Sequence, residues 1–286
     1  MPLPLDEVDW RAREHAHQER ADALTAEHRS RAAAGEKHPV WDFLFTYYSY
    51  KPSLLRRWHP GAGVALADAE ERAEWRWYSP GARPGEVFPD AAAFAAGKPQ
   101  KARLTELMLR RTAARPGQFG CFGLHEWAMV YRADETRHPV PLRLGKAGTD
   151  AVVEQADLRC THFDAFRFFT DDAVPLNRQP LTRDLQLDLE QPGCLHAGMD
   201  IYRWVVGLGP LVPGELLLDS FELARDIRLL DMEAAPYDLS AWDVRPVLIE
   251  TAEGKAEYVR RQREFAERGN ALRSAVLDAW LGRIAA

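Results

Sequence analysis

Two pairs of ionisable residues stand four positions apart in the C-terminal half of the chain. His196 and Asp200 lie in the segment CLHAGMDIYRWVVGL, and Glu222 and Asp226 lie in FELARDIRLL. Residues at i and i+4 share one face of a helix. An imidazole and a carboxylate placed in this way can bind one metal ion or form an oriented hydrogen bond. The spacing therefore predicts a site with His and carboxylate donors.

The ordinary alternative for each pair is a local ion pair. Asp200 has Arg203 three residues further on, and Arg225 and Arg228 lie close to the second pair. Ion pairs at i,i+3 and i,i+4 are routine on helix surfaces. Asp231, later in the same segment, is interpreted as an ordinary surface charge.

Two further segments place ionisable residues among apolar ones. CFGLHEWAMVYR contains His125 and Glu126, and THFDAFRFFT contains His162 and Asp164. If the second segment ends a strand, its two side chains project to the same side. The first segment is not an HExxH motif, which excludes a zincin.

A charge in an apolar segment is costly unless it is paired, neutralised or bound to a metal. The coincidence of several such segments favours one shared site over independent structural explanations. We therefore expect one cavity to be formed by His125, His162, His196, Asp200 and Glu222. Aromatic faces for stacking a flat ligand are expected from Trp41, Tyr47, Tyr48, Phe166 and Trp204.

The elements that must position these residues are mostly helical. Hydrophobic spacing, Pro and Gly predict a mainly α fold with a small antiparallel β insertion. Helices are expected at 6–34, 101–115, 122–132, 194–208, 215–235, 251–268 and 270–285. Short strands are expected at 141–144, 151–155 and 158–163, and a loop region with one strand pair at 61–90. We predict a flanking helix over residues 1–37 and a single α-rich catalytic domain over 38–286.

Composition narrows the class of protein. The 286 residues carry a net charge of −6, three cysteines without CxxC spacing, and no apolar run approaching the length of a membrane span. The expectation is a cytoplasmic protein without a membrane segment. Walker, GxGxxG, GxSxG and EF-hand motifs are absent from the sequence, which argues against nucleotide kinases, Rossmann oxidoreductases and α/β-hydrolases.

Four stretches resemble a bacterial family commonly labelled 3-methyladenine DNA glycosylase. They are HPVWDFLFTYYSYKPSLLRRWHPG, CFGLHEWAMVYR, THFDAFRFFT, and the run from QPGCLHAGMDIYRW through FELARDIRLLDMEAAPYDL. The resemblance extends from about His38 to the C-terminal helices. It implies removal of an alkylated purine base from damaged DNA, and it transfers no established catalytic residue.

The first hypothesis is therefore a carboxylate-assisted N-glycosylase without a cofactor, acting on damaged DNA or a free nucleobase-like molecule. Its catalytic candidates are Glu222, Asp200, His196 and Asp164. Its substrate-binding candidates are the five aromatic residues named above together with His125 and His162.

The second hypothesis is a helical non-haem metal-dependent oxidase or oxygenase that acts on a small aromatic or nucleobase-like molecule. Iron or another divalent metal would then be held by His196, Asp200, Glu222 and Asp226. The third is a non-enzymatic small-molecule-binding protein that uses the same aromatic pocket. The sequence leaves the oligomeric state open.

Overall fold

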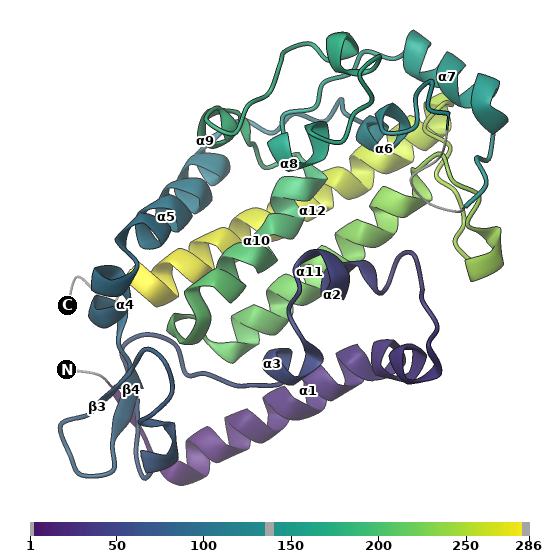
Figure 1. Cartoon of the computed structure of the whole chain (residues 1–286). Coiled ribbons are helices and arrows are strands. Elements are labelled where there is room, and N and C mark those ends of the chain that lie inside the picture. Colours follow the sequence, from purple (N-terminus) through teal and green to yellow (C-terminus); the bar gives the residue numbers. More distant parts are fainter. Residues whose placement is uncertain (1–2, 135–139, 282–286) are drawn as a thin grey trace. The chain divides into compact units, whose positions relative to one another are not determined.

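The computed structural model describes residues 3–134 and 140–281, and most of this chain is helical, as Figure 1 shows. The chain divides into two compact units. The first comprises Met1–Arg110, Ile201–Ala224 and Ala271–Ala286, and the second comprises Arg111–Asp200 and Arg225–Asn270. The mainly α prediction is confirmed. Residues 1–37, predicted as a flanking helix, belong to the first unit.

The first unit contains a long N-terminal helix, a small sheet and several short helices. Its elements in chain order are β1 (Leu3–Leu5), α1 (Glu7–Ala34), α2 (Phe43–Tyr47), α3 (Pro52–Leu55), β2 (Val64–Leu66), η1 (Glu70–Arg72), β3 (Tyr78–Pro80), β4 (Val87–Pro89), α4 (Ala91–Gly97) and η3 (Gly209–Leu211). The sheet order is β1-β2-β4-β3. β1 runs parallel to β2, whereas β2, β4 and β3 are antiparallel.

The helix α1 begins and ends where the sequence predicts. The side chain of Asp6 accepts a hydrogen bond from the backbone N–H of Asp9, and Gly35 ends the helix in the left-handed conformation (φ 72°). Its buried residues, Trp10, His17, Ala21 and Thr25, follow one stripe. Trp10 packs in a core cluster with side chains from the sheet.

The second unit holds most of the residues that the sequence offers for chemistry. Its elements are α6 (Leu124–Ala128), α7 (Gly145–Gln155), α8 (Phe163–Phe166), η2 (Val174–Leu176), α9 (Gln186–Leu189) and η4 (Ser240–Trp242). Four helices contribute residues to both units, namely α5 (Pro99–Ala114), α10 (Leu195–Leu208), α11 (Gly214–Glu233) and α12 (Ala252–Leu281). The predicted helices at 101–115, 194–208 and 215–235 match α5, α10 and α11, whereas α6 is shorter than the helix predicted at 122–132.

The predicted strands at 141–144, 151–155 and 158–163 are wrong, and 151–155 is part of α7. The antiparallel strands lie within residues 64–89, where one strand pair was expected. Burial of Thr149 and Val153 on one side of α7 outweighs the local β propensity of its valines. The predicted break near residue 269 is also absent, because α12 continues through Gly269; residues 282–285 of that prediction lie outside the described residues.

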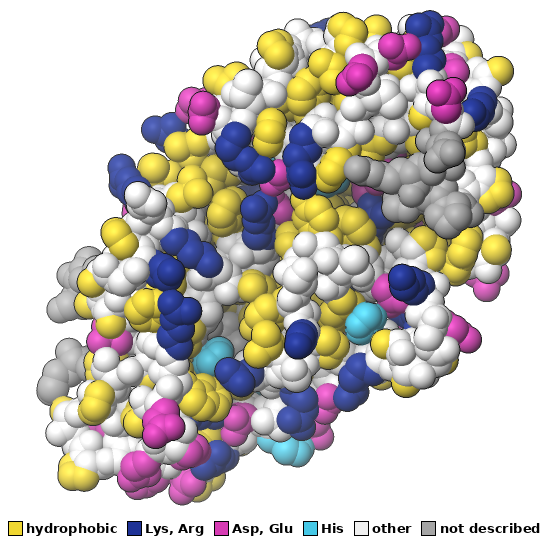
Figure 2. Space-filling model, viewed as in Figure 1, with side chains coloured by type: hydrophobic (Ala, Val, Ile, Leu, Met, Phe, Trp, Pro, Cys, Tyr) yellow, Lys and Arg dark blue, Asp and Glu magenta, His cyan; other side chains and the backbone are white. Residues whose placement is uncertain are grey.

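Charges of both signs are mixed on the visible surface. Figure 2 shows Lys and Arg side chains scattered over this face, with Asp and Glu side chains among them. Within the described residues, the helices are too short or too polar to cross a membrane.

Candidate metal centre

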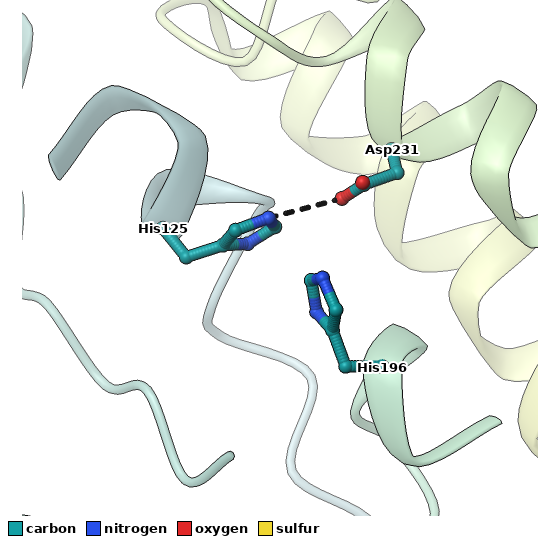
Figure 3. A group of neighbouring side chains, drawn as sticks. All are labelled: His125, His196 and Asp231. Carbon is teal, nitrogen blue, oxygen red and sulfur yellow. Dashed lines mark ion pairs between the residues drawn. The ribbon is translucent and has the colours of Figure 1, made fainter. Parts of the chain in front are cut away.

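Two histidines and one aspartate from three helices of the second unit point toward one another (Figure 3). His125 comes from α6, His196 from α10 and Asp231 from α11. Each offers one donor atom, and the three atoms lie within 4.8 Å of one another. Nε2 of His125 is 3.3 Å from Oδ1 of Asp231. The rings of His125 and His196 are nearly perpendicular, with centroids 4.2 Å apart.

An unusual backbone turn places His125. Phe122 (φ 47°) and Gly123 (φ 69°) are both left-handed immediately before α6. A non-glycine residue in this conformation carries strain, and such residues cluster at functional sites. The short helix that follows is completely buried, and the indole N–H of Trp127 donates to the carbonyl of Ala234 at 2.8 Å. The site therefore rests on an anchored segment.

Close packing of α10 against α11 places the other two donors. A Cβ atom on Gly198 would lie 2.7 Å from Cδ1 of Ile227, so a larger residue there would displace the end of that side chain. The start of α10 is fixed by the preceding turn, in which Gly193 donates to Gln191 and its carbonyl accepts from Gln262. Neither donor therefore depends on a long surface loop.

The surroundings of His196 and Asp231 shift the pKa values of both side chains. Burial, followed by His125, His162 and Arg228, lowers the pKa of His196 well below its ordinary value. Its ring is therefore neutral near pH 7 and can bind a metal ion without first losing a proton. Burial raises the pKa of Asp231 even though His125 and Arg228 oppose the shift.

Arg228 donates a hydrogen bond to one oxygen of the Asp231 carboxylate, Oδ2. Its Nη1 lies 2.7 Å from Oδ2 of Asp231 and 3.2 Å from Oε1 of Glu126. Within the described part of the chain, Oδ1 of Asp231 and Nε2 of His125 are buried and have no hydrogen-bond partner. Ligand atoms about 2.0–2.2 Å from a zinc-like ion lie about 3.0–3.5 Å from one another at ordinary coordination angles. The separation of 3.3 Å fits two ligands of one ion.

A pocket of about 320 Å³ adjoins this group, and both His125 and His196 line it. Its walls include Phe119, Phe169 and Tyr258 as well as the chain's three cysteines, Cys121, Cys160 and Cys194. Burial raises the pKa of each thiol, that of Cys160 to about 12. The cysteines therefore act as small neutral wall residues at pH 7 and not as thiolate nucleophiles.

A second group with His and carboxylate donors lies next to the first. It consists of His162, Glu190 and Asp200, all buried, with donor atoms within 4.8 Å of one another. Burial would lower the pKa of His162, but Glu190 and Asp200 outweigh burial and raise it. The ring centroids of His162 and His196 are 5.3 Å apart, so the two groups adjoin.

The structure thus brings together four of the five residues expected at one site, namely His125, His162, His196 and Asp200. It divides the His196/Asp200 pair between two groups, with His196 beside His125 and Asp231 and with Asp200 beside His162 and Glu190. The fifth residue, Glu222, belongs to the first unit. There its carboxylate accepts from Arg20 at 2.7 and 3.4 Å, with 30% of the side chain exposed. Glu222 is therefore a half-buried carboxylate paired with an arginine and is not brought to the group of histidines.

Two other predicted site carboxylates are also held by arginines. Asp226 is 36% exposed and pairs with Arg268 at 3.0 Å. Asp164 is buried and accepts two hydrogen bonds from Arg183, at 2.7 and 3.2 Å. The predicted strand end at His162 and Asp164 is instead the start of α8, so the two side chains have separate partners.

The predicted stacking residues have aromatic or arginine neighbours of their own. Tyr47 stacks on Phe43, Tyr48 meets Tyr202 edge-on, and Phe166 packs on Phe169. Trp41 lies near His38, and Arg203 lies over the ring of Trp204. The pocket beside the histidines is lined by other aromatic residues.

Asp231 and Glu190 belong to the two groups but were not predicted as site residues from the sequence. Asp231 is completely buried, which corrects its interpretation as a surface charge. A signal was present, because Asp231 follows the buried Ile227 by four residues on α11 and so belongs to its inner face. Glu190 follows a four-residue helix and shows no comparable periodicity.

Comparison with known proteins finds no matching family model, no matching curated protein and no matching solved structure. A function is therefore inferred from the geometry of the site alone. The resemblance to the glycosylase family stays a prediction.

Proposed function

We propose that the protein is a metal-dependent enzyme in which His125, His196 and Asp231 hold one divalent ion at the end of the pocket. One observation carries this proposal. Two buried donor atoms, Nε2 of His125 and Oδ1 of Asp231, face each other at 3.3 Å, and each has no hydrogen-bond partner among the described residues. A neutral His196 completes the set.

Two histidines and one carboxylate leave coordination positions open for a substrate, oxygen or water. This ligand set is typical of non-haem iron oxygenases and also occurs in catalytic zinc sites. The ion would supply redox or Lewis-acid chemistry at these positions. Arg228 holds the remaining oxygen of Asp231, which fixes the direction of the carboxylate.

The pocket indicates the class of substrate. Its volume of about 320 Å³ suits a small molecule, and its aromatic and thiol walls suit a flat and mainly apolar one. The proposal is therefore an oxidase or oxygenase, with iron as the first choice of metal, acting on a small aromatic or nucleobase-like molecule.

A base-removing glycosylase is the second candidate, and the aromatic pocket walls favour it. Phe119, Phe169 and Tyr258 offer faces on which an extruded base could stack. This candidate needs a carboxylate near the sugar but no metal. Damaged DNA is its partner, whereas the first candidate needs only the small molecule.

The two candidates are separated by measuring iron, manganese and zinc per chain alongside base release from alkylated DNA in chelator. We expect bound metal in the wild type, loss of an ion in His125→Ala and His196→Ala, and no base release. His15→Ala is the control, because His15 is 73% exposed on α1. Chelator-insensitive base release by metal-free protein would overturn the first candidate. Absence of both metal and base release would leave the small-molecule-binding hypothesis.

A further inference from the structure

The second group, formed by His162, Glu190 and Asp200, has the geometry of a ligand set in its own right. Nε2 of His162 lies 3.3 Å from Oε1 of Glu190 and 3.3 Å from Oδ2 of Asp200. All three side chains are buried, with 1 or 2% exposed. The three residues come from the N-cap of α8, the C-cap of α9 and the helix α10.

A hydrogen bond alone accounts poorly for these distances. Charge-assisted bonds between an imidazolium and a carboxylate are usually about 2.7–2.9 Å long. Nε2 hydrogen-bonds Oδ2 of Asp200, but this contact is longer than that range and no shorter than its contact with Oε1 of Glu190. Ligand atoms about 2.0–2.2 Å from one ion lie about 3.0–3.5 Å from one another. Both distances from Nε2 of His162 match this spacing, and all three donor atoms lie within 4.8 Å of one another.

The neighbouring side chains orient the Glu190 carboxylate. Gln186 donates from Nε2 to Oε1 of Glu190 at 2.6 Å, and Arg183 donates to the amide oxygen of Gln186 at 3.1 Å. Outer hydrogen bonds of this kind fix the direction of metal-ligating carboxylates. These hydrogen bonds hold the Glu190 carboxylate in a defined orientation beside His162.

We propose that His162, Glu190 and Asp200 bind a second divalent ion next to the one held by His125, His196 and Asp231. The helix α10 then supplies one ligand to each ion, through His196 and Asp200. The imidazole and carboxylate donors suit iron, manganese or zinc. Joint action of the two ions on one substrate rests on the proposed function, whereas binding at the second group is tested by itself.

The test is a titration of metal-depleted full-length protein with Co(II), with bound cobalt counted per chain. We expect two ions in the wild type and in His15→Ala, one in Glu190→Gln and one in His125→Ala. Glu190→Gln keeps the volume of the side chain, and Asp200→Asn provides a second isosteric variant. Circular dichroism checks that each variant is folded.

The outcomes separate this inference from the proposed function. One ion that is lost in His125→Ala and retained in Glu190→Gln would overturn the second site and leave the first. One ion with the opposite behaviour would support the second site and overturn the first. A wild type that binds no cobalt would overturn both.

Discussion

Asp42 in the first unit and Asp231 in the second are both buried aspartates, but their surroundings differ in kind. The carboxylate of Asp42 accepts hydrogen bonds from Arg31 and from the backbone N–H of His38, and His28 lies at 2.9 Å. These partners outweigh burial and lower its pKa to about 2. Asp231 has one oxygen on Arg228 and the other turned toward His125 without a hydrogen bond, and its pKa is raised.

We interpret this difference as that between a structural carboxylate and a proposed metal ligand. A buried charge whose acceptor positions are filled by the protein stabilises the fold. A buried donor atom left open beside other donors costs stability unless something binds there.

Asp231→Asn should weaken binding of a divalent metal at least about 100-fold, because it removes a charged ligand, and even outer partners of ligands change affinity by about 10–100-fold. Asp42→Asn should leave the affinity unchanged. Isothermal titration of metal-depleted variants checks both. Equal affinities in the two variants would remove the distinction between the two aspartates.

Metal should stabilise the wild type more than His125→Ala, which loses the first ion and keeps only the second group. A ligand that binds only the folded state at 100 times its Kd adds about 2.7 kcal/mol to the free energy of unfolding. Denaturant unfolding with and without metal measures this gain. A gain of the same size in His125→Ala would place the ion elsewhere.

Asp42→Asn should lower the free energy of unfolding at pH 7 by about 2 kcal/mol, the value of a pKa lowered from 3.8 to about 2. Because the folded pKa lies below the unfolded one, this contribution is complete above pH 4. It is lost as the pH falls toward 2. The stability difference between wild type and variant, followed by denaturant unfolding from pH 7 downward, should shrink over that window. A constant difference would show that the effect is not electrostatic.

Glu222→Gln should have the smallest effect. The pair with Arg20 is about one third exposed on both sides, and ion pairs of this kind contribute about 0.2–1 kcal/mol. We expect a loss below about 1 kcal/mol and an unchanged metal content. Loss of bound metal in this variant would restore Glu222 as a ligand.

Much of the helical framework could be predicted, because caps and spacing are local signals. Asp6 and Gly35 mark the ends of α1, and the periodicity of α10 and α11 placed His196 on a helix. The β propensity of Val152 and Val153 predicted a strand at 151–155. In the folded chain, burial of one side of α7 outweighs this local preference.

The site itself could be predicted only in part. Glu222 and Asp231 lie nine residues apart on one helix, and local composition does not tell which is buried. Glu222 is half-buried and pairs with Arg20, which lies 202 residues away in the sequence. The partner of Asp231 is His125 from another distant segment. Contacts of this range are a property of the folded chain.

The most direct test of the first metal site is a crystal structure of the metal-loaded protein with anomalous data collected at the absorption edge of the metal. We predict a peak about 2.0–2.2 Å from Nε2 of His125, a ring nitrogen of His196 and Oδ1 of Asp231. Absence of a peak there, with His125 hydrogen-bonded directly to Asp231 in protein shown by assay to contain metal, would contradict the account.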